Sequence, residues 1–288
     1  MAARTRPIVA LTIAASDSGG GAGIQGDLAT FAALGVYGIS VLTAGTAQNT
    51  RGIAAVEPFS AAFVGSQMDS VLPDFRPSAV KIGALYDGAR VRAVAAGLKR
   101  HNPPNVVLDP VLAAKDGSPL LAPRALATLR RELLPLCDLV TPNLPEAEAL
   151  ARIPIRDSSD RRLAAGILAD AGPRAVLIKG GHGRGPVLQD LLFDGKRFRE
   201  FQHPRTGAGA VHGTGCALSA AIAANLALGL SLDDAVGGAI DYVQAALREP
   251  VFPGRGRAVP NRFATPGSPT PSTERRTRER RRRSRKRR

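Results

Sequence analysis

The sequence lacks several features that define whole classes of protein. It contains no Trp, 4% aromatic residues, and only two Cys among 288 residues. Two cysteines are too few for a disulfide scaffold, and no apolar run reaches the roughly 18 residues of a membrane-spanning helix. A G-x-x-x-x-G-K-[ST] loop, zinc-type Cys/His spacing and a G-x-S-x-G segment are also missing. The sequence therefore does not favour a P-loop enzyme, a zinc site or an α/β-hydrolase.

What is present suits an aliphatic core. Hydrophobic residues make up 44% of the chain, and 31 Gly with 22 Pro stay below a low-complexity content. This composition excludes a collagen and a wholly disordered chain. The length favours one large domain, with two small domains as the alternative.

The positive charge is concentrated at the C-terminus. Residues 274–288 contain 11 Arg or Lys and 2 Glu, so this segment supplies +9 of the formal net charge of +15. Such a block is typically disordered and solvated. It is either a solubilising tail or a contact for nucleic acid or an anionic surface. Because no aromatic residue interrupts it, stacking on bases is not indicated.

The N-terminus faintly resembles a signal peptide, since Arg4 and Arg6 precede the apolar stretch PIVALTIAAS. That stretch is short and leads directly into SDSGGGAG. A strand that feeds a glycine-rich loop explains the pattern better, so a cytoplasmic location is expected.

Short apolar runs alternate with segments of helical periodicity. The predicted strands are 8–15, 37–42, 79–82, 106–108, 139–140, 175–179 and 187–193. The predicted helices are 24–34, 61–71 (ended by Pro73), 90–100, 124–134, 146–152, 160–171, 216–228 and 232–247. This alternation predicts an α/β fold in which helices cover both faces of a parallel sheet. Ligands then bind at the carboxyl ends of the strands. The pattern stops after Pro250, so the folded part is expected to end near Phe263.

The first glycine-rich segment, Gly21 to Gly26, reads G-x-G-x-x-G between a predicted strand and a predicted helix. A dinucleotide fold would also place an acidic residue about 20 positions further on. The next strand leads instead into TAGTAQNT, which has no acid. NAD binding is therefore not favoured, although the glycines let the backbone lie close to a flat ligand.

The strongest local signal is His212-Gly-Thr-Gly-Cys216, which opens an Ala-rich helix. Backbone N–H groups at such a helix start can form an anion hole for a phosphate in transfer. Cys216 lies in the first turn, where a thiol pKa tends to be lowered, and it could take a proton from a substrate hydroxyl. The alternative is a small residue that packs a helix start. Cys137 is expected in the core.

Polar residues follow several predicted strands. Asp109, Asn143, Glu146 and Lys179 all fall at or just after strand ends. Together with an anion hole they indicate a phosphoryl-transfer site. Carboxylates and Asn can hold Mg²⁺ directly or through water, and a Lys can offset the charge of triphosphate oxygens.

Six segments in order carry a specific resemblance: IAASDSGGGAGIQGDL, TAQNTRG, VVLDPVLAAKDGSPLL, TPNLPEAEAL, LIKGGH and HGTGCALSAAIAA. The chain from about Ile8 to Phe263 resembles the hydroxymethylpyrimidine/phosphomethylpyrimidine kinases of the ribokinase-like superfamily. The resemblance implies a three-layer α/β/α fold with a mostly parallel sheet. It implies a kinase domain at residues 1–263, followed by a disordered tail at 264–288 that is rich first in Pro, Ser and Thr and then in Arg.

The resemblance also implies an activity. ATP with Mg²⁺ would phosphorylate 4-amino-5-hydroxymethyl-2-methylpyrimidine and then its monophosphate, which gives the diphosphate in thiamine biosynthesis. The partners it implies are this small pyrimidine and a second copy of the chain in a homodimer. No membrane is expected as a partner, and nucleic acid only through the Arg-rich tail.

The family's site residues carry over by motif. Gln48 and Asp27 would hold the pyrimidine, whose edge offers both donors and acceptors. The pocket wall would be formed by Ala15, Ala22, Thr46, Ala84 and Val111. Cys216 would activate the hydroxyl, while the amides of Gly213, Thr214, Gly215 and Cys216 would stabilise the transferring phosphoryl group. The ATP–Mg²⁺ set would be Lys179, Asn143, Glu146 and Asp109, with Asp109 and Glu146 holding Mg²⁺ directly or through water.

Three departures from the family pattern leave alternatives open. Ala84 stands where the family often has Met, Ala210-Val211 replaces Asn-Thr, and Ala29 replaces a Lys. The room beside Ala84 suits a pyridoxal kinase on the same fold. A non-catalytic binding protein that acts through the basic tail is the more distant alternative.

Overall fold

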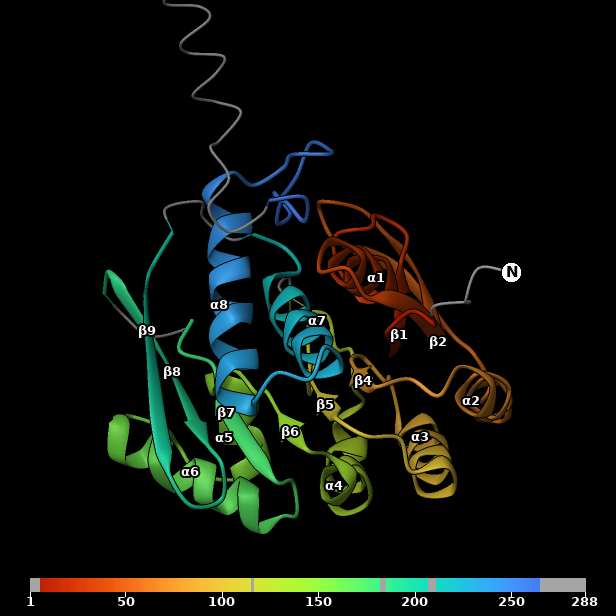
Figure 1. Ribbon diagram of the computed structural model, residues 1–288, viewed down its shortest axis with the longest axis horizontal. Coiled ribbons are helices and arrows are strands. Elements are labelled where there is room, and N and C mark those ends of the chain that lie inside the picture. Colours follow the sequence, from red (N-terminus) through yellow and green to blue (C-terminus); the bar gives the residue numbers. More distant parts are fainter. Residues whose placement is uncertain (1–5, 115–116, 182–184, 207–210, 265–288) are drawn as a thin grey trace, which may run out of the picture.

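One large sheet organises the chain, as the computed structural model in Figure 1 shows. The structure describes residues 6–114, 117–181, 185–206 and 211–264. Within them the sheet has nine strands in the order β3-β2-β1-β4-β5-β6-β7-β8-β9. The strands are β1 (Val9–Asp17), β2 (Tyr37–Gln48), β3 (Ile53–Pro58), β4 (Ala79–Ile82), β5 (Val106–Leu108), β6 (Leu139–Val140), β7 (Ala175–Ile178), β8 (Val187–Phe193) and β9 (Phe198–Pro204).

The centre of the sheet is parallel and its two edges are antiparallel. Neighbouring strands from β2 to β7 pair in parallel. At one edge β3 is antiparallel to β2, and at the other β8 is antiparallel to β7 and β9. Parallel neighbours need crossover connections, which helices usually provide. The predicted α/β fold with a mostly parallel sheet is confirmed.

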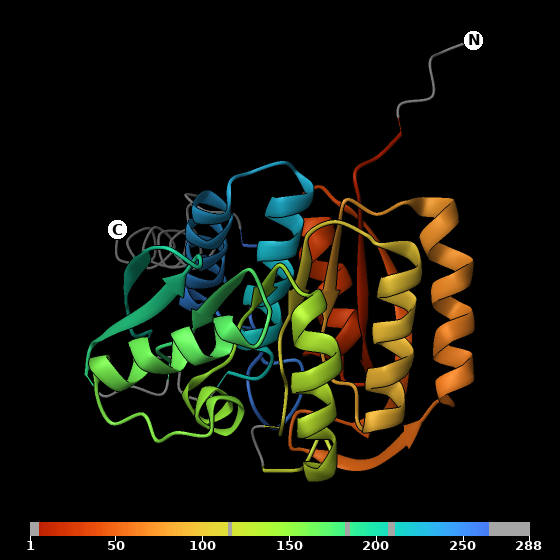
Figure 2. The same cartoon turned by 90° about the horizontal axis from the view of Figure 1, so that it is seen from below.

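Helices cover both faces of the sheet and complete three layers. They are α1 (Gly23–Ala33), α2 (Ala61–Phe75), α3 (Gly88–His101), α4 (Leu126–Thr128), α5 (Leu144–Ala151), α6 (Ser158–Asp170), α7 (Thr214–Ala227) and α8 (Leu232–Arg248). The helices α2 to α6 pack on one face, and α1, α7 and α8 on the other (Figure 2). No helix in the described ranges has the length and apolar content needed to cross a membrane.

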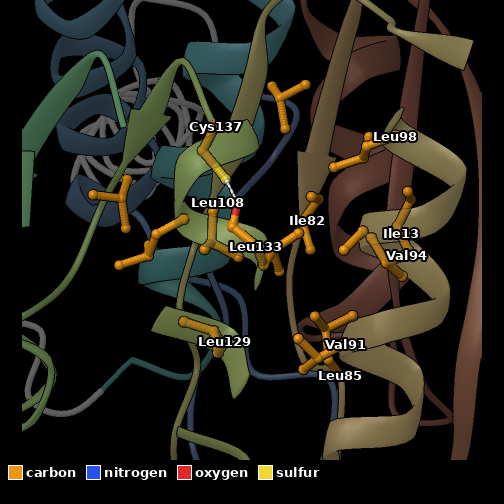
Figure 3. Close-up of a cluster of buried hydrophobic side chains, with 14 of the residues drawn as sticks. Ile13, Ile82, Leu85, Val91, Val94, Leu98, Leu108, Leu129, Leu133 and Cys137 are labelled. Carbon is orange, nitrogen blue, oxygen red and sulfur yellow. Dashed lines mark hydrogen bonds between the residues drawn. The ribbon is translucent and has the colours of Figure 1, made fainter. Parts of the chain in front are cut away.

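The inner strands are buried on both faces, which explains their short apolar runs. Successive side chains of a strand point to opposite faces, so Val107 belongs to the buried cluster on the face of α1, α7 and α8, whereas Leu108 belongs to the cluster on the face of α2 to α6. Figure 3 shows part of the cluster on the face of α2 to α6, with Leu108 beside Leu133, and Ile82 between Leu108 and Val94 of α3. Cys137 belongs to the same cluster and is 3% exposed, so its predicted place in the core is confirmed.

The strands at the edges were the hardest to predict. The strand predicted at 37–42 continues to Gln48, and the sequence pattern missed β3 and β9. Both missed strands are largely exposed. Edge strands need no continuous apolar run, so they lack the signal that marks the buried strands.

Two predicted helices differ in detail. Helix α2 passes through Pro73 and ends at Phe75, because a proline in the last turn removes only one backbone hydrogen bond. The helix predicted at 124–134 is instead a series of short 3₁₀, α and π turns at Pro123–Leu136, with a proline near each end.

A C-terminal strap, residues 250–264, lies across the glycine-rich loops. Val251 and Val259 pair with each other, and the backbone N–H of Arg257 donates to the Thr50 carbonyl at 2.8 Å. The buried Arg262 guanidinium donates to the Gly21 carbonyl at 2.9 Å. The predicted domain boundary at residue 263 stays a prediction, because residues 265–288 of the tail lie outside the described residues.

Candidate functional site

A cavity of about 920 Å³ lies at the carboxyl ends of the parallel strands. Every site residue predicted from the sequence lines it except Asp27. The reason is topological, since parallel strands direct their carboxyl ends to one edge of the sheet. The lining residues that were predicted are Ala15, Ala22, Thr46, Gln48, Ala84, Asp109, Val111, Asn143, Glu146, Lys179, Gly213, Thr214, Gly215 and Cys216.

The start of α7 forms a backbone anion hole in this cavity. Gly213 caps the helix with φ +83°, and no side chain in the described part of the chain caps the first turn. A Cβ on Gly213 would lie 2.0 Å from the Gly21 carbonyl oxygen, so only glycine fits here. The N–H groups of the first turn have no partner within the helix, and with the helix dipole they favour an anion.

A cluster of charged residues faces the anion hole. Lys179 Nζ lies 2.7 Å from Asp109 Oδ1 and 3.9 Å from Glu146 Oε2. Glu146 and Asn143 form a capping box at the start of α5, which fixes the Glu146 side chain. Burial opposes the charge on Lys179, but the Asp109 and Glu146 carboxylates raise its pKa above the ordinary value.

The pKa of Glu146 is raised by its surroundings in this cluster. Burial raises its pKa to about 7; the Lys179 charge opposes that shift, and the Asp109 charge adds to it. Burial also acts on Asp109, but Lys179 and Lys81 hold its pKa below the ordinary value. The chain's own residues therefore place one firmly ionised carboxylate, Asp109, beside one that titrates near neutrality, Glu146.

The residues also fit a shared Mg²⁺ ion. The described residues contain no cluster of three or more His, Cys, Asp or Glu side chains that could hold a metal by themselves. Mg²⁺ commonly takes only one or two carboxylates and completes its shell with water and substrate phosphates. Asp109 and Glu146 repel each other across the cavity wall, and a divalent cation would relieve that repulsion.

Cys216 is half-buried in the cavity wall. Burial raises the pKa of its thiol, while the Lys81 charge and a hydrogen bond from the Gly23 N–H lower it. Asp109 and Asp27 add to the rise. The expectation of a lowered thiol pKa was wrong, because burial and nearby carboxylates outweigh the helix start.

Beneath Cys216 lies a buried ion pair that the sequence did not reveal. Lys81 Nζ lies 2.8 Å from Asp27 Oδ2, and both side chains are fully buried. The Thr12 hydroxyl donates to the same oxygen at 2.6 Å. The other oxygen, Oδ1, has no hydrogen-bond partner among the residues that the structure describes, so Asp27 retains a free acceptor although it does not line the cavity. Burial raises the pKa of Asp27, and Lys81 opposes that rise.

The opposite end of the cavity is organised by Gln48 and His212. The Gln48 amide nitrogen lies 3.0 Å from His212 Nε2, which lies 3.0 Å from Asp17 Oδ2. Asp17 also accepts the N–H groups of Gly19 and Ala22 at the glycine-rich loop. These bonds tie the N-terminal loop to the loop that precedes α7. Asp17 and Lys81 were missed, although Asp17 stands in the first of the six motif segments and Lys81 in the predicted strand 79–82.

A second lobe of the cavity lies between β8, β9 and α8. It is lined by Leu188, Val243 and Leu247. His203 bridges this lobe, with Nε2 at 3.2 Å from Asp190 and Nδ1 at 2.9 Å from Gln244. An apolar slot with a few placed polar groups suits a flat ring. The sequence pattern missed it because β9 was missed.

Two departures from the family pattern can be located in part. Ala84 lines the cavity, so the smaller side chain does leave room there. Val211 is 3% exposed. Ala210, like residues 182–184 of the segment after Lys179, lies outside the described residues.

Comparisons with known proteins show the family of the chain. The family model described as phosphomethylpyrimidine kinase matches residues 17–261. A protein of Rhizobium meliloti (strain 1021), named hydroxymethylpyrimidine/phosphomethylpyrimidine kinase, is 50% identical over 240 residues, which cover 83% of this chain and 90% of that protein.

Solved structures share the fold. A phosphomethylpyrimidine kinase from Clostridium difficile 630 superposes with a TM-score of 0.74 at 41% identity, covering 82% of this chain and 98% of that one. The pyridoxal kinase from Staphylococcus aureus, in complex with AMP-PCP and pyridoxal, gives a TM-score of 0.82 at 30% identity, covering 90% and 95%.

The buried ion pair predicts a stability effect. Lys81→Met leaves the Asp27 carboxylate buried without its cation, so we expect a loss of about 3–5 kcal/mol in unfolding free energy. Lys81→Met combined with Asp27→Asn removes both charges and should regain much of that loss. Urea denaturation at pH 7 measures both variants. Equal losses in the single and double variants would contradict the role of the ion pair.

Glu146 predicts a pH dependence. Its folded-state pKa of about 7 lies above the ordinary value of 4.5, so between these values the folded protein binds more protons than the unfolded chain. Stability then falls as pH rises through this window. In the ligand-free protein, Glu146→Gln should remove about 1–3 kcal/mol of the decline between pH 5 and pH 8. Denaturation curves across that range test this, and parallel declines in both proteins would refute it.

Proposed function

The chain belongs to the phosphomethylpyrimidine kinase family, and we propose that the single cavity described above carries both of the phosphoryl transfers expected of such an enzyme. The protein is a phosphotransferase that acts in thiamine biosynthesis. It transfers the γ-phosphoryl group of ATP first to the hydroxymethyl oxygen of 4-amino-5-hydroxymethyl-2-methylpyrimidine and then to the resulting monophosphate. The observation that supports this assignment is the meeting of Gln48, Cys216 and Lys179 in one cavity.

Gln48 binds the pyrimidine ring at one end of the cavity. Its amide offers a donor and an acceptor, which match an aminopyrimidine edge. Asp27 adds a carboxylate, and its unpartnered buried oxygen supports this role because such an atom is costly to leave unpaired. Lys81, which lines the cavity, binds the other oxygen of Asp27, so this contact requires the ring to approach Asp27 beside Lys81. The flat walls formed by Ala15, Ala22, Thr46, Ala84 and Val111 enclose the ring.

Cys216 takes the proton from the hydroxyl that attacks. The raised pKa of the thiol makes its thiolate a stronger base, at the cost of a smaller ionised fraction near neutral pH. Lys81 and the Gly23 N–H favour the thiolate, which is the form that can accept the hydroxyl proton. On taking the proton the thiolate becomes a neutral thiol, and the negative charge passes through the attacking oxygen to the phosphoryl group, which the anion hole faces.

The anion hole and Lys179 act on the phosphoryl group. The backbone N–H groups of Gly213 to Cys216 donate to its oxygens, where negative charge accumulates during transfer. Lys179 offsets the charge of the bound triphosphate, and Asn143 holds Glu146 in place through the capping box. The apolar lobe beside His203 accommodates the adenine base.

Mg²⁺ is part of the proposal, with Asp109 and Glu146 as the residues that would hold it. When bound, the ion neutralises phosphate charge. A homodimer, a cytoplasmic location and nucleic-acid contact through the Arg-rich tail stay predictions.

The test is a product-resolved assay with ATP, Mg²⁺ and hydroxymethylpyrimidine. We expect both mono- and diphosphate, with ATP consumption to match. Pyridoxal and pyridoxine belong in the same panel, because Ala84 leaves room for a broader ring. A preference for pyridoxal over the pyrimidine would overturn the assignment and favour a pyridoxal kinase.

Cys216 supplies the mechanistic prediction. Cys216→Ala should lower kcat about 10²- to 10⁴-fold, the usual range for a general base. Gln48→Ala is the matched control, because it removes ring contacts and should act mainly through KM. Steady-state kinetics with saturating ATP separates the two effects. Near-normal kcat in Cys216→Ala would assign the proton transfer to another group.

A further inference from the structure

The cations that line the cavity differ in whether they already have a partner. Lys81 and Lys179 are each paired with a buried carboxylate. Arg205 donates to backbone carbonyls at its own edge of the cavity. Arg257 also lines the cavity, yet no hydrogen bond or ion pair in the described part of the chain engages its guanidinium group. This half-buried cation is therefore available to a ligand.

The C-terminal strap holds the Arg257 backbone in a defined place. The N–H groups of Gly256 and Arg257 donate to the Thr50 hydroxyl at 2.9 Å and to its carbonyl at 2.8 Å. On the other side, the Ala258 carbonyl accepts the His212 N–H at 2.8 Å. Thr50 follows the ring-binding strand, and His212 directly precedes the anion hole. Arg257 thus lines the cavity from a segment that is anchored to Thr50 on one side and to His212 on the other.

Glycine makes this placement possible. A Cβ on Gly256 would lie 2.3 Å from the Thr50 carbonyl oxygen, so the strap lies against the turn backbone to backbone. Arg255, two residues before Arg257, is exposed and does not line the cavity. Of these two neighbouring arginines, only one faces the cavity.

The two substrates place different demands on this region. The first acceptor is a neutral alcohol, whereas the second carries a phosphate monoester close to the same reacting centre. The cavity wall already contains the carboxylates Asp17, Asp109 and Glu146, which would repel that phosphate. A guanidinium group is well suited to bind it, because its planar N–H donors match phosphate oxygens in pairs.

We propose that Arg257 recognises the phosphate of the monophosphate substrate and so sets the second phosphoryl transfer apart from the first. The proposal rests on the proposed function, because it presumes two acceptors in one cavity. The ligand class is an aromatic methyl phosphate. The neutral alcohol offers Arg257 no comparable anion.

The test compares Arg257→Met with Arg255→Met, which removes the same charge from the same strap outside the cavity. For Arg257→Met we expect the ratio of kcat/KM for the monophosphate to that for the alcohol to fall about 10- to 100-fold, the range for a lost hydrogen bond to a charged group. In Arg255→Met the ratio should match wild type. Arg257→Lys should recover part of the loss, and thermal melts check that all variants fold.

Calorimetric binding of the monophosphate without ATP gives a second readout that does not need turnover. Weaker binding in Arg257→Met, together with a smaller dependence on salt than in wild type, would support the proposal. An unchanged ratio and unchanged binding would overturn it, as would equal losses for both acceptors. If the wild-type protein phosphorylates neither acceptor, the proposed function fails, whereas wild-type activity with an unchanged ratio defeats the role of Arg257 alone.

Discussion

The site depends on the close approach of two glycine-rich loops that are almost 200 residues apart in the sequence. Gly213 lies so near the Gly21 carbonyl that a Cβ would be 2.0 Å from the oxygen. This contact brings the starts of α1 and α7 together, so the Gly23 N–H and Cys216 meet. Arg262 binds the same Gly21 carbonyl, and the hydrogen bond between His212 and Asp17 joins the loops a second time. Glycine is needed because any side chain would separate the two backbones.

Charge in the cavity is largely paired before any ligand arrives. Lys81 with Asp27 and Lys179 with Asp109 are buried pairs, and each carboxylate keeps its ammonium group ionised in a poorly solvated place. The pairing is incomplete at Glu146, whose pKa rises to about 7. Glu146 lies where we propose that a metal-bound triphosphate binds, and Arg257 lines the cavity where we propose that a phosphorylated substrate binds. This pairing avoids the cost of leaving a buried Lys or Asp charge without a partner.

Sequence patterns located the buried part of the fold well. The inner strands β4, β5 and β6 have the predicted bounds, because a strand buried on both faces must be a short apolar run. Edge strands such as β9 have no such requirement, and the lobe that contains His203 was missed with it. The motif residues were placed in the cavity correctly, because each stands at a strand end or a helix start and its position follows from the topology of the sheet. Asp27 is the exception, since its place in a motif does not reveal that it is fully buried in an ion pair with Lys81.

By itself, the sequence determined the fold class, the family and the position of most cavity residues, because those follow from periodicity, from strand ends and from motifs. Only the tertiary structure decided which charges neutralise one another, since Lys81 and Asp27 are 54 positions apart and no local pattern pairs them. It also reversed the expected acidity of Cys216, because burial and neighbouring carboxylates act through space. It brought Arg257 into the cavity for the same reason: the strap is placed by contacts with Thr50 and His212, residues that are distant in the chain and adjacent in the fold.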